Sequence, residues 1–309
     1  MRLQIICHCL LVVLFSSCSK KSSQPDKLLS LAAIHRVPVL VPEGLEDYAM
    51  RDIHDLTGSV RKLVYYETDF SDDSTRRQRK IIALNKHGKI KERTLYDLAG
   101  YKTKQIFHYD EQHQLHEIIT QTQDDKLIKI EKSFYDASGH CIREEFTGPD
   151  SKLNMQVNVV INPETGLLNE RINYDASGNE GFCYQYYYDT DLKLTLVNGF
   201  ENNNLHERTE FYYDEDGFIE QTLKTTRGSL VYDYFQYDGK GRMIEWKTDG
   251  IGNEVFSGVR YTYRDDQKGN WVKKEISKFS QVNQDGGDGE IFREEARRTR
   301  LIERAITYF

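Results

Sequence analysis

A few histidine, cysteine and acidic side chains are the residues of this 309-residue chain that could do chemistry, and their spacing argues against it. His140 and Cys141 are a base and a nucleophile by type, but adjacent residues on a strand point to opposite faces of a sheet. His113 and His116 could bind a metal, yet no third ligand follows at a fixed spacing. The acidic, Gly-rich segment 285–289 lacks the ordered oxygen ligands and the closing Glu of a calcium loop. The sequence therefore predicts a protein that is not an enzyme, with no catalytic residues, no metal site and no cofactor.

Aromatic side chains form a candidate binding surface. The chain has 20 Tyr, 14 Phe and 2 Trp, many of them on segments expected to be neighbouring strands. Aromatic rings on an exposed face can stack on sugars or hold an apolar partner. The alternative is that they form the core of a sheet that is short of aliphatic residues. The possible ligand-facing aromatic residues are Tyr187, Tyr212, Tyr232, Tyr234, Trp246 and Tyr261.

The elements that would position these residues are set by a recurring phrase, in which Tyr-Asp is followed by two further residues and Gly. Clear copies occupy residues 96–100, 135–139, 174–178, 213–217 and 237–241. Asp at the first position of a type I turn bonds its own backbone two residues on, and Gly at the fourth position takes the left-handed conformation of a bulged hairpin. Each phrase therefore predicts a hairpin end, with Tyr as the last residue of the incoming strand.

The spacing of the phrases predicts the fold. Equivalent positions recur in steps of 24 to 27 residues at Asp110, Asp136, Asn162, Asp189, Asp214 and Asp238, and other turn-like stretches lie halfway between them. About 16 strands at ~4.7 Å would make an open sheet ~75 Å wide, which would curl or split. We therefore predict an all-β chain, a long antiparallel meander of hairpin repeats that forms a curled, largely single-layer sheet with its more aromatic face concave. Two stacked sheets are the alternative.

The composition agrees with such a sheet. Apolar residues make up 38% of the chain and charged residues 29%, the net charge is -7, and the mean hydropathy is -0.67. This balance suits a sheet that buries one face and keeps much of the other wet. A net acidic chain without a basic block is a poor candidate for nucleic acid. Residues 290–309 fit either a helix face or an alternating strand, and we predict a strand.

The start of the chain resembles a bacterial lipoprotein signal. A basic Met1-Arg2 precedes an apolar run over residues 3–15, which is too short to span a bilayer comfortably, and two Ser residues and Cys18 follow. The resemblance implies cleavage before Cys18, palmitate-type lipidation of its thiol, and anchoring in the outer membrane with the periplasmic face favoured. An ordinary cleaved signal is the alternative. We expect a signal peptide over residues 1–17, a lipidated tether and lead-in over 18–55, and the repeat sheet over 56–309.

The remaining cysteines are expected to stay reduced. Cys7 and Cys9 would leave with the signal and Cys18 would carry lipid, so that Cys141 and Cys183 remain. The meander places them three strands apart, or about 14 Å at ~4.7 Å per strand. Bridged cysteines need Cα atoms within about 7 Å. The sequence therefore predicts two free thiols.

The series of Tyr-Asp-x-x-Gly phrases over residues 85–271 resembles the YD repeat of the RHS family. The resemblance implies tandem hairpins that wind into a long curled β-sheet. RHS proteins are usually far longer and enclose a C-terminal toxin, whereas about 45 residues follow Arg264 here, so toxin delivery is not implied. The whole layout, including residues 268–271 and 303–308, resembles small YD-repeat lipoproteins of Gram-negative bacteria without a toxin domain.

These features together predict a non-enzymatic, lipid-anchored repeat protein of the bacterial envelope. We expect it to present a β-sheet surface to a protein partner and to be held at the membrane by the lipid on Cys18. A carbohydrate- or peptide-binding module with an aromatic concave face is the alternative. A hydrolase whose site carries no recognised motif is the further alternative.

Overall fold

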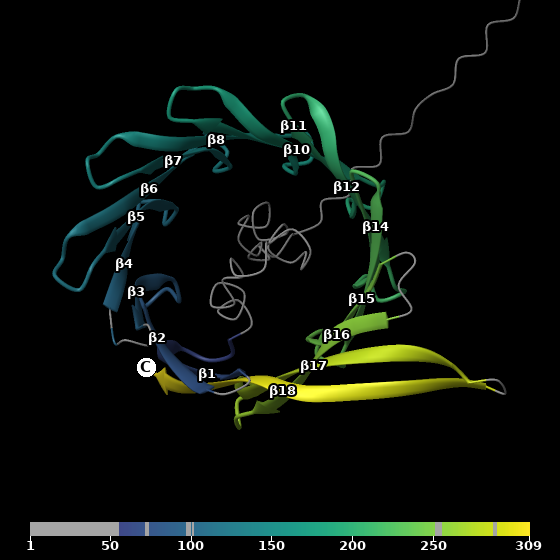
Figure 1. The fold of residues 1–309 in the computed structure, drawn as a ribbon. Helices are drawn as coiled ribbons and strands as arrows, with labels where there is room; N and C mark the ends of the chain where they lie inside the picture. Colours follow the sequence, from purple (N-terminus) through teal and green to yellow (C-terminus); the bar gives the residue numbers. More distant parts are fainter. Residues whose placement is uncertain (1–55, 72–73, 97–99, 101, 251–254, 287–288) are drawn as a thin grey trace, which may run out of the picture.

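The computed structural model describes residues 56–309 except 72–73, 97–99, 101, 251–254 and 287–288 (Figure 1). The predicted signal peptide, Cys18 and the predicted lead-in therefore lie outside the described residues. The described chain forms β1 (Val60–Ser71), β2 (Ser74–Leu84), β3 (Ile90–Tyr96), β4 (Lys102–Tyr109), β5 (Leu115–Gln121), β6 (Leu127–Tyr135), β7 (Cys141–Thr147), β8 (Leu153–Ile161), β9 (Leu168–Asp175), β10 (Glu180–Tyr188), β11 (Leu194–Glu201), β12 (Asn204–Tyr213), β13 (Ile219–Thr226), β14 (Ser229–Tyr237), β15 (Met243–Gly250), β16 (Val255–Asp265), β17 (Trp271–Gly286) and β18 (Gly289–Tyr308). None of its helices is long and apolar enough to cross a membrane.

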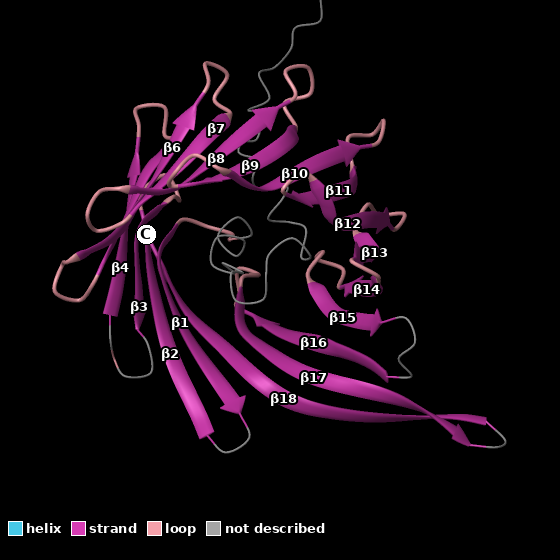
Figure 2. Cartoon of the chain, turned by 45° about the horizontal axis from the view of Figure 1, so that its top comes forward, coloured by secondary structure: helices cyan, strands magenta, loops and turns pink. Residues whose placement is uncertain are grey.

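The sheet closes on itself, and the prediction of a curled open sheet is wrong. Each strand pairs antiparallel with the next, and β1 pairs with β18 as well as β2, which makes an 18-stranded antiparallel barrel. Figures 1 and 2 show the resulting ring of strands. Twist accumulates across a sheet of this width until its two edges meet. Closure pairs β1 with residues 300–308 of β18, while residues 289–298 of β18 pair only with β17, in a hairpin that extends beyond the ring. Leu63 on β1, between Ile306 and Ile82, has no exposed surface.

The described Tyr-Asp turns have the predicted conformation, and the 96–100 phrase lies mostly outside the described residues. In the 136–139 turn, the Gly139 N–H donates to Asp136 O at 3.0 Å, the Asp136 N–H donates to His140 O at 2.9 Å, and Gly139 has φ +84°. Asp136 Oδ1 also accepts the backbone N–H groups of Ser138 and His140. The same two carboxylate contacts cap the turns at Asp175, Asp189, Asp238 and Asp266.

The end of the chain completes the wall. The strand prediction for residues 290–309 is confirmed, because β18 pairs with β17 on one side and β1 on the other. Hydrogen bonds among Thr57, Asn270, Tyr308 and Asp266 join the starts of β1 and β17 to the end of β18 at one rim of the barrel, and we call this group the seam. Asn270, 1% exposed, accepts the Thr57 N–H at 2.7 Å and donates to Thr57 O at 2.9 Å and to the Tyr308 hydroxyl at 2.8 Å. Tyr308 in turn donates to Asp266 at 2.7 Å.

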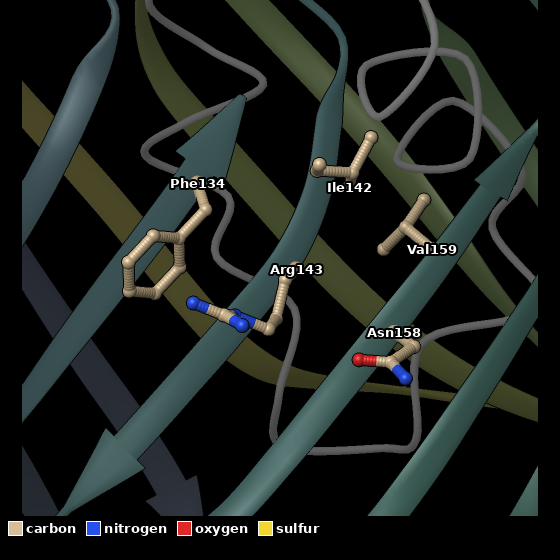
Figure 3. Close-up of a pocket in the computed structure, with 5 residues that line it drawn as sticks. All are labelled: Phe134, Ile142, Arg143, Asn158 and Val159. Atoms are coloured by element: carbon tan, nitrogen blue, oxygen red, sulfur yellow. The ribbon is translucent and has the colours of Figure 1, made fainter. Parts of the chain in front are cut away.

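Figure 3 shows which face of the wall is outside. It looks at β6 to β8 with strands of the opposite wall behind them, and Phe134, Arg143 and Asn158 point towards the viewer, away from the barrel. Phe134 pairs with Arg143 and Arg143 with Asn158, and paired residues share a face. Their neighbours along the strands, such as Tyr135 and Val157, therefore belong to the inner face.

The buried apolar clusters lie on the inner face. One extends over β8 to β15 and includes Val157, Val197 and Phe211. The other extends over β1 to β5 and β16 to β18 and includes Leu63 and Ile82. The wall therefore uses its inner side for packing and leaves its outer side for other contacts.

Candidate functional site

The register divides the six aromatic residues singled out from the sequence between the two faces. Following the paired residues from β8 to β15 places Tyr187, Tyr212, Tyr232 and Tyr234 outside, and Trp246 and Tyr261 inside. The structure therefore does not bring all six together on a concave face. Four of them share the convex outer wall.

The outer tyrosines are exposed and held in place. The exposed fractions are 44% for Tyr187, 41% for Tyr212 and 37% for Tyr234. The Tyr187 hydroxyl donates to Gln185 and the Tyr212 hydroxyl donates to Glu210, both at 2.9 Å. The bond to Glu210 raises the pKa of Tyr212. These contacts fix the rings while leaving much of each ring open to solvent.

Tyr232 and Tyr234 form a ring pair on β14. Their ring centres lie 6.4 Å apart with 20° between the planes, which is a stacked arrangement. Tyr212 and Tyr234 both pair with Gln221 on β13, so Tyr212 belongs to the same surface. We call Tyr187, Tyr212, Tyr232 and Tyr234, with Leu196 and Leu223 between them, the tyrosine surface.

Exposed apolar side chains gather on this side of the barrel. Among the strand residues whose side chains the structure describes, the exposed large hydrophobic residues all lie between β7 and β14: Ile142, Val160, Phe182, Tyr187, Leu205, Tyr212, Leu230 and Tyr234. Phe182 stacks with Tyr184 on the inner face and Ile142 lies at the bulge opposite Tyr135, whereas the other six face outward. Scattered exposed apolar residues need no explanation, but a contiguous group marks a binding surface. The tyrosine surface lies within this arc.

The two inner aromatic residues are part of the packing. The Trp246 indole donates to Asp233 Oδ1 at 2.8 Å, and the Thr248 hydroxyl bonds the same oxygen. The Lys274 amine lies 4.5 Å from the centre of the Tyr261 ring. Both rings pack against the buried clusters. They therefore stabilise the inner wall and are separated from the tyrosine surface by the sheet.

Sequence reasoning missed the role of the Tyr in the Tyr-Asp pairs. In three of these pairs the hydroxyl donates to the carbonyl of the first residue of the preceding strand, and so joins one hairpin to the next along the rim. Tyr263, which is followed by Arg264, makes the same bond. The pairs are Tyr109 to Ile90 (2.8 Å), Tyr135 to Leu115 (2.7 Å), Tyr213 to Leu194 (2.7 Å) and Tyr263 to Met243 (2.9 Å). The signal in the sequence is the constant separation of 19 or 20 residues between donor and acceptor.

The similarities of this chain to known proteins are with solved structures at low sequence identity. Neither a family model nor a curated protein matches it. A porin-like protein from Bacteroides uniformis ATCC 8492 is similar, with 11% identity over 80% of this chain and 98% of that chain and a TM-score of 0.44. A porin-like protein from Bacteroides vulgatus ATCC 8482 has 12% identity over 82% and 99%, with a TM-score of 0.28. The Photorhabdus luminescens Tc holotoxin pore has 12% identity over 75% of this chain but 16% of that chain, with a TM-score of 0.33. The RHS resemblance is matched by no family model and stays a prediction.

His140 and Cys141, a base and a nucleophile by type, have different surroundings in the structure. His140 Nδ1 lies 3.3 Å from Asp136 Oδ2, whereas Cys141 lies on the inner face opposite Tyr135. Burial raises the pKa of the Cys141 thiol to about 11 and that of Cys183, on the outer face beside Glu170, to about 12. Both cysteines are buried free thiols. Protonated thiols are weak nucleophiles, so neither is suited to covalent chemistry.

Two other places offer little for chemistry. The described residues contain no group of three His, Cys, Asp or Glu side chains that could hold a metal ion; the 285–289 segment lies partly outside them. A depression is lined by Phe134, Ile142, Arg143, Asn158 and Val159, of which Phe134, Arg143 and Asn158 face outward (Figure 3). Its Arg143 guanidinium lies 4.1 Å from the centre of the Phe134 ring and 3.2 Å from Glu145. Its one charged group is therefore already engaged.

Proposed function

We propose that this chain is a non-enzymatic, lipid-anchored binding protein of the bacterial envelope that presents the outer wall of its barrel to a partner. The observation that carries the proposal is the gathering of exposed apolar side chains on the outer face of the β8 to β14 arc. Aromatic residues are enriched where proteins recognise partners. A closed sheet holds such residues in fixed positions, which lowers the entropy lost on binding.

The chemistry of the outer wall supports a barrel surrounded by water. Cross-strand ion pairs lie on it, including Lys104–Glu92 at 3.2 Å and Arg260–Glu245 at 2.6 Å. A lipid-facing wall is apolar, and a single Lys or Arg there costs about 2–4 kcal/mol at the bilayer midplane. Attachment to the membrane is therefore assigned to the lipid on Cys18, from the pattern of residues around it.

Site-specific photocrosslinking in the native envelope tests the proposal. A photoreactive phenylalanine analogue replaces Tyr212, and in a matched variant it replaces His108, which is exposed on the outer face of β4. We expect discrete crosslinked species from position 212 and none from position 108. Equal yields from both positions, or none from either, would contradict a binding role for this arc. A Cys18→Ser variant should leave the membrane fraction, and its retention there would remove the anchor from the proposal.

A further inference from the structure

The tyrosine surface consists of two rows that run across the strands. In each row, residues from successive strands are paired side by side in the sheet register. The first row is Tyr187, Leu196, Glu210, Leu223 and Tyr232, and the second is Tyr212, Gln221 and Tyr234. Aromatic rings thus alternate with aliphatic, amide and carboxylate groups in both rows.

The spacing of the rings is that of an extended sugar chain. Tyr212 and Tyr234 lie two strands apart, or roughly 9.5 Å across the sheet. This is about the length of a disaccharide in an extended β-linked polysaccharide. Tyr187 and Tyr232 lie four strands apart, or roughly 19 Å, which is twice that length. A chain along the second row would meet its two rings two sugar units apart, and a chain along the first row would meet its two rings four units apart.

The polar side chains between the tyrosine rings can hydrogen-bond the hydroxyl groups of a sugar. The face of a pyranose ring presents C–H groups that pack on an aromatic ring, and its edge presents hydroxyl groups that need donors and acceptors. Gln221 and Glu210 lie between the tyrosines and supply an amide and a carboxylate. The stacked pair on β14, Tyr232 and Tyr234, offers two nearly parallel rings.

The charges near the surface are largely paired within the protein. Arg208 lies 3.0 Å from Glu210, and Lys247 lies 2.9 Å from Glu245. A strongly charged ligand would find no block of opposite charge there. This favours a neutral ligand.

We propose, resting on the function proposed above, that the tyrosine surface binds an extended, neutral β-linked polysaccharide that lies across β10 to β14. Tyr212 and Tyr234 lie two strands apart in one row, so an extended chain can touch both rings at once. A helical α-linked chain would curve away from them. No covalent step is involved, and the sugar chain is bound without being cleaved.

Binding of defined oligosaccharides to the purified mature lipoprotein in detergent tests this proposal. The probes are cellohexaose and chitohexaose, which are extended and β-linked, and maltohexaose, which is α-linked and helical, each measured by calorimetry. We expect at least one β-linked probe to bind at least about tenfold more tightly than maltohexaose, the ratio that corresponds to one well-placed stacking contact. Failure of both β-linked probes to bind, or equal binding of maltohexaose, would overturn the assignment.

Variants locate the site and separate ring stacking from folding. Tyr212→Ala and Tyr234→Ala should each weaken binding about fivefold, since each removes one stacked ring. Tyr212→Phe keeps the ring and should bind within about twofold of the natural protein. Tyr66→Ala, on the outer face of β1 outside the arc, is the matched control and should change nothing. Binding that is insensitive to both Tyr→Ala changes would overturn the site.

The two proposals fail in different ways. If position 212 crosslinks to an envelope protein while neither β-linked probe binds, the sugar assignment is overturned and the binding role of the arc stands. If position 212 yields no more crosslinks than position 108 and the probes also fail, both are overturned. Crosslinks from position 212 that vanish on glycan digestion support both.

Discussion

Tyr212 and Tyr213 are adjacent in the sequence, but their side chains lie on opposite faces of the wall and make different contacts. Tyr212 points outward and donates to Glu210, while Tyr213 points inward and donates to the backbone carbonyl of Leu194 at 2.7 Å. The Asp that follows Tyr213 caps the turn by accepting the Phe218 N–H. The Tyr-Asp pair therefore sets both the turn of one hairpin and its attachment to the hairpin before it.

These different roles predict different losses of stability when each hydroxyl group is removed. Tyr213→Phe removes the donor to a half-buried carbonyl and should lower the free energy of unfolding by about 1–2 kcal/mol. Tyr212→Phe removes an exposed bond and should change it by less than about 0.5 kcal/mol. Urea denaturation followed by circular dichroism measures both. Equal losses would contradict the role assigned to Tyr213.

The rim tyrosines also predict a response to alkaline pH. Burial raises the pKa of Tyr109 and Tyr213 to about 12, above the value of about 10 expected in an unfolded chain. A group whose folded pKa is raised stabilises the fold fully below pH 10, and that contribution is lost as the pH rises through about 12. We expect a late phase in the phenolate absorbance near pH 12 that coincides with unfolding. The Tyr213→Phe variant should lose part of this late phase, and a single phase near pH 10 would contradict the burial.

At the scale of the element, each hairpin is specified within a few residues. Gly178 closes the 175–178 turn with φ +81°, and an added Cβ there would meet nothing within 4 Å. The requirement for Gly is therefore conformational and not a matter of space. The Asp and Gly of each turn act on their own backbone, which is why the turns could be predicted without knowledge of the rest of the chain.

A pair of Gly→Ala changes tests this. Gly178→Ala places a Cβ in the left-handed region and should cost about 1–2 kcal/mol. Gly181→Ala, three residues on in β10 with an ordinary φ and its nearest neighbour 3.6 Å from the added Cβ, should be neutral or slightly stabilising. Thermal unfolding of the two variants gives the comparison. A loss at Gly181 as large as at Gly178 would show that local φ does not govern the turn.

The faces of the strands could not be predicted as well as the turns. Hairpins carry a bulge, such as the shift between Gln236 and Tyr237 opposite Met243, and a bulge moves the in-and-out alternation by one residue. Met243 and Trp246 therefore both face inward although they are three residues apart. For the same reason the register separates Trp246 and Tyr261 from the four outer tyrosines.

At the scale of the whole molecule, closure depends on contacts between the two ends of the described chain. Asn270 bonds Thr57, 213 residues away, and Tyr308, 38 residues away, and it is buried. Asn270→Ala would leave a backbone N–H and carbonyl of Thr57 without their partner. This seam explains the 268–271 and 303–308 segments that stood out in the sequence.

The seam predicts where the barrel opens first. Asn270→Ala should lower the free energy of unfolding by about 2–3 kcal/mol, because a buried donor and acceptor lose their bonds. The amides of β1 and β18 should exchange with solvent faster than those of β10 to β13, as measured by hydrogen exchange. Asn179→Ala, at the equivalent position of the ordinary 175–178 turn, is the control and should affect only its own hairpin. Uniform acceleration around the barrel would contradict a local seam.

The sequence by itself determined the hairpins, their antiparallel order and the strand character of residues 290–309, because the Asp, Gly and alternation that specify them act over a few residues. The tertiary structure alone decided that the sheet closes and which side of each strand faces out. Closure follows from twist summed over 18 strands and from the pairing of β1 with β18, contacts that join the two ends of the described chain. The outward position of the four tyrosines follows from bulges that no local pattern in the chain reveals.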